Sequence, residues 1–414
     1  MFTSVIGALT SLLPKYFIFG SYVPVLIFSF VNLGMVYLFS AWSRFEIEFW
    51  LGKSAALSIA VAFVATVVMA YVVSAINDYL REFLEGKHLP GWLETELCAE
   101  QKRRRMVRAD RYAKARRQRF ILEDLIDWCE RQLRHATERP VMRRPAPVRR
   151  QTDYVAKLRE LVMNGALHNT LHNALSTGQF KKNRRVVRRA TAQMARRIAL
   201  HGMPLPANVE SDRRDFLLRM GAVLNSMKSV EYELGADLFT RFGNDPVKPT
   251  RMGNIADAIH AYTIGRYKME LTVFFSRLQT LLARTEDKGN SLVFDAKTQL
   301  DFLVACCWFS ALTTVIWSAL LASFSGDLVA YIILPIVGTA TTVALYFLAC
   351  EAYLAYGEVV RASIDIDRFT LLRKLAVGLP NSLREERKLW GTMSHLAFSG
   401  GDSIELSYDH SETP

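Results

Sequence analysis

Residues 302–323, FLVACCWFSALTTVIWSALLAS, and residues 328–355, LVAYIILPIVGTATTVALYFLACEAYLA, decide the fold of this 414-residue chain. Each stretch is long enough to cross the hydrocarbon core of a bilayer, which needs about 20 helical residues. Two further stretches of this kind, residues 17–41 and 54–76, lie near the N-terminus. The sequence therefore predicts an all-α protein with four transmembrane helices.

Lys and Arg are concentrated between the second and third spans. Residues 79–299 contain 42 Lys+Arg and 25 Asp+Glu, whereas residues 42–53 contain two of each and residues 323–327 contain no basic residue. Basic loops stay on the cytoplasmic side of a membrane. We therefore expect both termini and the long middle segment to be cytoplasmic.

The chain divides into four predicted parts. Residues 1–78 hold a short interfacial helix and spans 1 and 2, and residues 79–299 form a strongly basic, helical cytoplasmic domain inserted between spans 2 and 3. Residues 300–377 hold spans 3 and 4 with a helical extension, and residues 378–414 form a cytoplasmic tail. The helical prediction for the middle part follows from apolar residues that recur at spacings of three and four.

Two basic runs indicate a phosphate-bearing partner. Residues 101–119 hold ten basic residues and one acidic residue, and residues 181–197 hold eight basic residues and none that is acidic. Anionic lipid head groups are the favoured partner for a chain in a bilayer; nucleic acid is second because few aromatic side chains lie nearby for base stacking, and charge left in solvent is a third interpretation. The candidate phosphate- or lipid-binding residues are Arg103, Arg104, Arg105, Arg184, Arg185, Arg188 and Arg189.

Motifs for metal or enzyme chemistry were sought and not found. His168 and His172 lie one helical turn apart, but Asn169 stands where a zinc protease needs its Glu, and no third ligand lies near. G-x-S-x-G, Walker A, G-x-G-x-x-G and C-x-x-C sequences are missing. We expect no metal, no cofactor and no enzymatic activity.

Two carboxylates lie at the predicted spans. Asp301 is at the entrance of the third span and Glu351 is near the inner end of the fourth. A charge there is costly unless it is partnered or faces water. Glu351 either reaches the membrane interface or, like Asp301, faces a pore or a helix–helix seam.

Residues 248–278, KPTRMGNIADAIHAYTIGRYKMELTVFFSRL, carry a motif. This stretch resembles the P-T-R-x-G-N sequence of an uncharacterised family of bacterial multi-pass membrane proteins, to which no activity is assigned. The N-x-x-x-R-x-x-x-E-G, D-x-x-R-x-x-L-L and E-E-x-x-x-W elements of that family match further positions. His260 stands where the family has an acidic residue, and Lys268 stands where it has glycine. The resemblance implies a bacterial inner-membrane location.

The matched positions lie beside the inner ends of the spans. We predict that they meet in one layer under the inner leaflet, in which Arg251 and Asn254 bond to the segment of Arg81 and Glu85. The candidate members of this membrane-junction network are Asn77, Arg81, Glu85, Arg251, Asn254, Arg266, Tyr267, Asp365 and Arg368.

The sequence favours a non-enzymatic, oligomeric channel or pore-type membrane effector that is gated by its cytoplasmic domain. Four helices enclose little space, so a conduit requires several copies around an axis, and we expect a homo-oligomer. The alternative is a membrane-anchored scaffold or sensor that binds anionic lipid, nucleic acid or a protein partner through its basic helices.

Overall fold

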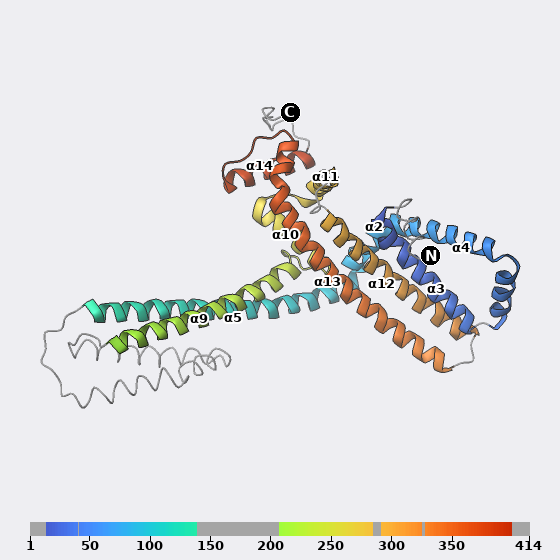
Figure 1. Cartoon of the computed structure of the whole chain (residues 1–414), viewed down its shortest axis with the longest axis horizontal. Helices are drawn as coiled ribbons and strands as arrows, with labels where there is room; N and C mark the ends of the chain where they lie inside the picture. The colour runs from blue at the N-terminus through green and yellow to red at the C-terminus, as the bar shows by residue number, and fades with distance from the viewer. Residues whose placement is uncertain (1–13, 40, 139–206, 285–290, 325–327, 400–414) are drawn as a thin grey trace. The chain divides into compact units, whose positions relative to one another are not determined.

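The computed structural model describes residues 14–39, 41–138, 207–284, 291–324 and 328–399, and these ranges are helical, without a β-strand (Figure 1). Four helical stretches are long and apolar enough to cross a membrane. They are Lys15–Phe39, Val61–Glu85, Leu292–Ser323 and Val329–Lys374. The prediction of an all-α, four-span membrane protein is thus confirmed.

The first span contains a turn of π-helix. Its elements are α2 (Lys15–Phe17), the π-helix η1 (Ile18–Tyr22) and α3 (Val23–Phe39). Pro24 lies two residues after the π turn, and such turns accommodate a residue that breaks the regular hydrogen-bond ladder. Gly20 in this turn lies against Asp301, since a Cβ at Gly20 would be 3.7 Å from the Asp301 Cβ.

Three long helices complete the membrane part. They are α4 (Ala41–Glu85), α12 (Ser291–Phe324) and α13 (Leu328–Lys374). Helix α4 continues past the apolar stretch to Glu85 and ends at Gly86, whose φ of +89° favours glycine. Helix α13 also continues far beyond its apolar half, so both helices carry polar residues on one side of the spans. This side is called the inner side below, after the orientation that the charge distribution predicts.

Three shorter helices pack on the inner half of α13. They are α10 (Arg251–Tyr267), α11 (Leu271–Arg284) and α14 (Leu383–Ser399). The side chains of Phe274 and Trp390 are completely buried in their shared core, with ring centroids 5.1 Å apart. Helix α14 lies in a region that was predicted only as a tail. The segment is helical because Glu386, Trp390 and Met393, at helical spacing, form one buried face.

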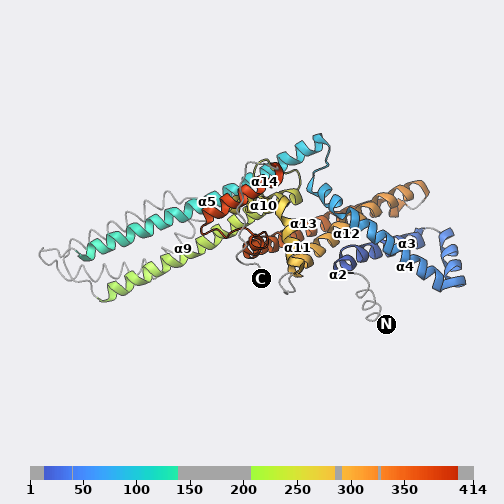
Figure 2. The ribbon, with the colours of Figure 1, turned by 90° about the horizontal axis from the view of Figure 1, so that it is seen from above.

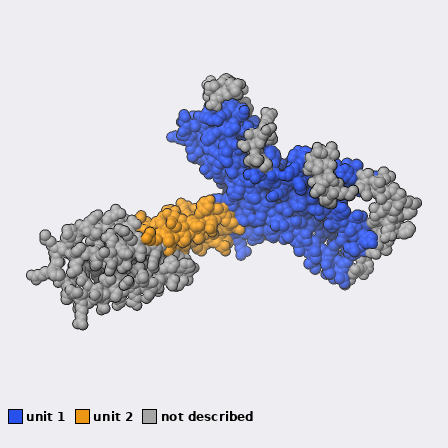
Figure 3. Space-filling model, in the orientation of Figure 1, with its two compact units in different colours: residues 1–104, 239–414 blue, residues 105–238 orange. Residues whose placement is uncertain are grey.

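The chain forms two compact units, residues 1–104 with 239–414 and residues 105–238 (Figure 3). The second unit holds most of α5 (Gly91–Glu138) and α9 (Ala207–Arg241), which lie side by side (Figures 1 and 2). Helices α10 and α11, predicted as part of the domain at 79–299, belong to the unit that contains the spans. The predicted interfacial helix before Pro14 lies outside the described residues.

Helix α10 ends in a left-handed residue that is not glycine. Lys268 has φ 63° and ψ 20°, and its N–H bonds to the carbonyls of Thr263 and Ile264. Glycine is the usual residue at such a helix end because a Cβ is strained there. The left-handed backbone at position 268 therefore explains the glycine that the resemblance implies there.

We expect Lys268→Gly to raise the free energy of unfolding by about 0.5–1 kcal/mol, because it relieves left-handed strain. Lys268→Ala, which loses the same side chain but keeps a Cβ, is the matched control and should give no gain. Thermal unfolding of the purified protein in detergent measures both. An equal effect of the two substitutions would show that the side chain matters and not the backbone.

Candidate functional site at the inner membrane junction

The predicted network is divided between two places along α13. Tyr353 belongs to the first and Asp365 to the second, and these residues are 365 − 353 = 12 positions apart, or about 18 Å along a helix. We call them the junction cluster (Asp78, Arg81, Glu85, Asp301 and Tyr353) and the inner cluster (Tyr262, Arg266, Tyr267 and Asp365). The expected single layer is therefore corrected to two clusters on one continuous helix.

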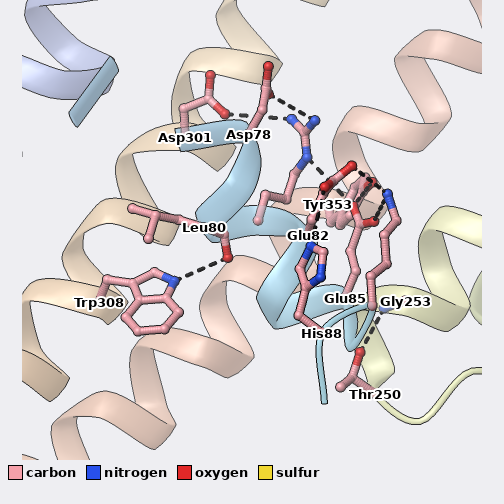
Figure 4. A network of polar contacts seen from close by, with 12 residues as sticks. Asp78, Leu80, Glu82, Glu85, His88, Thr250, Gly253, Asp301, Trp308 and Tyr353 are labelled. Atoms are coloured by element: carbon pink, nitrogen blue, oxygen red, sulfur yellow. Dashed lines mark hydrogen bonds and ion pairs between the residues drawn. The ribbon is translucent and has the colours of Figure 1, made fainter. Parts of the chain in front are cut away.

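Arg81 is the centre of the junction cluster, and its partners Asp78, Glu85 and Asp301 are labelled in Figure 4. Its guanidinium lies 2.9 Å from Asp78, 3.5 Å from Glu85 and 3.9 Å from Asp301. Asp78 and Glu85 are on α4 itself, at the spacings that bring helical side chains together. Asp301 comes from α12, so one cation links the inner ends of two spans.

Glu85 is almost fully buried, with 6% of its side chain exposed. Its carboxylate accepts a hydrogen bond of 2.8 Å from the Tyr353 hydroxyl and lies 3.3 Å from the Lys87 ammonium. Burial acts to lower the pKa of Lys87, but hydrogen bonds and the charges of Glu82 and Glu85 outweigh it, so the pKa is raised and Lys87 stays charged. Three partners thus offset the desolvation of one carboxylate.

Helix α10 touches the end of α4 through backbone. Thr250 caps α10, since its hydroxyl accepts from the Gly253 N–H at 3.0 Å. The Gly253 Cα lies so close to the Glu85 carbonyl oxygen that a Cβ there would overlap it. A Cβ on Gly86 would in turn lie 2.6 Å from Pro249. Both glycines are therefore required by close approach.

Asn254 and Arg251 make other contacts than those predicted. Asn254 accepts from the Lys248 N–H at 2.9 Å and donates to the carbonyls of Lys248 and Thr250, which fixes the turn before α10. The Arg251 guanidinium lies over the Phe347 ring, 4.7 Å from its centroid. The P-T-R-x-G-N segment thus meets the end of α4 through Gly253, which lies on Glu85, and through Pro249 and Thr250, which lie on Gly86.

The inner cluster surrounds Asp365. The hydroxyls of Tyr262 and Tyr267 donate to its two carboxylate oxygens at 2.8 and 2.7 Å. Arg266 donates to the Tyr262 hydroxyl at 2.7 Å and lies 3.8 Å from Asp365. Burial, followed by the hydrogen bond to Asp365, raises the pKa of Tyr267 to about 12, so this phenol keeps its donor proton at physiological pH.

Arg368 lies beside the inner cluster and binds the C-terminal helix. Its Nε is 2.7 Å from Glu386 of α14, and its guanidinium is 4.6 Å from the centroid of Tyr267. It also donates to the Asp365 carbonyl. The pair is well buried, with 16% of the Arg368 side chain and 4% of the Glu386 side chain exposed.

The remaining predicted residues lie elsewhere. Asn77 is buried one turn before Arg81, and Glu351 is 62% exposed and pairs with Arg241. In the first basic run, Arg104 pairs with Glu100 at 2.7 Å, and Arg103 and Arg105 lie beside it on α5. The second basic run and the histidine pair fall outside the described residues; they are Arg184, Arg185, Arg188, Arg189, His168 and His172.

Polar side chains inside the spans join helices of the same chain. Trp317 of α12 donates to Asn32 of α3 at 2.8 Å, and the hydroxyls of Ser310 and Thr342 are 2.9 Å apart between α12 and α13. Trp308 of α12 donates to the Leu80 carbonyl of α4 at 3.1 Å (Figure 4). These bonds hold α12 at the centre of the four spans.

The chemistry of both clusters is that of ion pairs and hydrogen bonds, and the Nε of Arg81 is buried without a hydrogen bond, at ion-pair distance from Glu85. Within the described ranges, no group of three or more His, Cys, Asp or Glu side chains is placed to hold a metal ion. Sequence reasoning missed Asp78, Lys87, Tyr262 and Tyr353. Helical spacing from Arg81 points to Asp78, but no sequence signal selects Tyr353 across 268 positions.

No family model, no curated protein and no solved structure matches the chain. The resemblance to the bacterial membrane family therefore stays a hypothesis that rests on the quoted motifs.

We expect Gly253→Ala to lower the free energy of unfolding by about 1–3 kcal/mol, because the new methyl group overlaps the Glu85 carbonyl. Gly265→Ala, in the same helix but with nothing within 4 Å of its Cβ, is the control and should be neutral or stabilising. Thermal unfolding in detergent compares the two. Equal changes in both variants would contradict the close approach of α10 and α4.

We expect Arg368→Gln to destabilise the protein by about 3–5 kcal/mol, because Glu386 is left buried without its cation. The double variant R368Q/E386Q should regain most of that loss. Limited proteolysis, followed at the C-terminal helix, and thermal unfolding measure the effect. A double variant as unstable as R368Q would show that the pair is not coupled.

Proposed function

We propose that this protein is a non-enzymatic, oligomeric channel or pore-type membrane effector in which the inner helices set the position of the membrane helices. The continuity of α13 carries this proposal. This helix runs unbroken from Leu328 in the span to Lys374 on the inner side, and both polar clusters are attached to it. A movement of the inner helices therefore reaches the membrane without passing through a flexible joint.

Helix α10 makes this coupling stiffer because it runs beside α13 in the same direction. Its first residue, Arg251, contacts Phe347, Ile259 packs on Gly357, and Tyr262 bonds to Asp365. Contacts at three successive points oppose bending between the junction cluster and the inner cluster. The pair of helices thus transmits displacement along its length.

The polar groups inside the spans are used for packing within one chain, so the proposed conduit lies between copies of the chain. Asn32, Ser310 and Thr342 bond to neighbouring helices of the same chain, so these groups serve helix packing. A path for ions therefore forms between subunits, which requires a homo-oligomer. We further propose a bacterial inner-membrane location with both termini cytoplasmic, and contact of the basic α5 with anionic lipid.

Purified protein in liposomes tests the proposal by ion flux, and mass measurement in nanodiscs tests assembly. We expect an oligomer that conducts, and we expect Arg81→Gln to change the flux several-fold, because the charged link between α4 and α12 is lost. Lys114→Gln, which breaks a surface pair of 2.6 Å within α5, is the control and should conduct as the unaltered protein does.

A protein that stays monomeric at every concentration and passes no ions would overturn the channel proposal. If flux is missing but replacement of Arg103, Arg104 and Arg105 by Gln releases anionic vesicles, the scaffold alternative is favoured instead.

A further inference from the structure

The C-terminal end of α9 is attached to α13 by a two-point ion pair. Arg241, the last residue of α9, donates through Nη1 to Glu351 Oε1 at 3.1 Å and through Nη2 to Glu351 Oε2 at 3.4 Å. This fork geometry fixes direction as well as distance. Arg241 is the last residue of α9 (Ala207–Arg241), so a displacement of this helix end acts on the pair directly.

Glu351 stands at the edge of the apolar part of α13. Phe347 and Leu348, one turn before it, are 42% and 54% exposed apolar side chains of the span. The carboxylate itself is 62% exposed. An ionised carboxylate next to the hydrocarbon core needs either a cation or water. Arg241 supplies the cation while the pair is closed.

The loss of Arg241 and the loss of Glu351 therefore have different consequences. Without Arg241, Glu351 keeps an uncompensated charge beside apolar surface, and its hydration favours a displacement of α13 toward the cytoplasmic side. Without Glu351, the Arg241 guanidinium extends into water or toward lipid phosphates at little cost. The partially exposed pair is also weak enough to open and close reversibly.

We propose that the Arg241–Glu351 pair is a releasable contact through which α9 holds α13 in its outward position, so that withdrawal of Arg241 moves α13 inward. This inference rests on the proposed function, because it names the contact that regulates the membrane helices. It assigns to α9 the role of a control element and to Glu351 the role of the charge that drives the movement.

Labelling of a cysteine at position 344 tests the proposal without any measurement of flux. Ala344 is exposed and lies seven residues before Glu351, on the same face of α13. In Ala344→Cys protein in nanodiscs, a water-soluble maleimide is applied and modification of residue 344 is followed by mass spectrometry. We expect Arg241→Gln to speed modification by at least about threefold, because an unpartnered charge pulls the helix toward water.

The asymmetry between partners is the decisive result. Glu351→Gln and the double variant R241Q/E351Q should both be modified at the rate of the parent. Equal acceleration by R241Q and E351Q would indicate mere structural loss and overturn the proposal, as would no change in R241Q. If R241Q does not fold, Arg241→Lys, which keeps the charge without the fork, should give an intermediate rate; a rate equal to the parent would overturn the proposal.

The matched control is Lys114→Gln, which removes a surface ion pair from α5 and should leave labelling unchanged. If labelling does not follow the expected pattern but the protein conducts ions, only the role of the Arg241–Glu351 pair is refuted. Failure of flux with the predicted labelling pattern would refute the channel and leave the movement of α13 established.

Discussion

The buried carboxylate of Glu85 is the constraint on which the arrangement of the inner helices depends. A carboxylate removed from water must be matched by cations and donors, and leaving it unmatched is strongly destabilising. The partners come from Arg81 and Lys87 near the end of α4 and from Tyr353 of α13. Because Gly253 rests on the carbonyl of the same residue, α10 is positioned with them. One charge thus fixes where several elements meet.

Helix α13 organises the rest by carrying two polar clusters at different depths. Its outer half packs on α12 through close contacts such as that of Gly338 with Thr314, whereas its inner half is covered by α10, α11 and α14. The same helix is therefore a membrane span at one end and the core of a helical assembly at the other. No separate linker divides the two roles.

Hydrophobic length was enough to predict the four spans, because the hydrocarbon core of a membrane fixes the length of a helix that crosses it, and the spacing of apolar residues predicted further helices. The importance of Arg81 and Glu85 was also accessible, since both follow directly from the second span. Their partners were not, because Tyr353 and Asp301 meet α4 only after distant helices pack. The same limit explains why Arg251 was expected to bond to the segment of Arg81 and Glu85, whereas its guanidinium lies over the Phe347 ring. Sequence spacing determines contacts within a helix and leaves contacts between helices open.

Charged side chains join the helices α5 and α9. Arg108 pairs with Asp237 at 2.8 Å and Arg119 pairs with Glu231 at 2.7 Å, and among the described side chains of α5 Leu122 is fully buried. Dissolved salt screens such partly exposed pairs, and at 1 M the screening length falls to about 3 Å. Apolar burial of the kind seen around Trp390 does not weaken in this way. The ionic strength of the surrounding solution therefore acts on the ion pairs between α5 and α9 and spares the apolar core around Trp390.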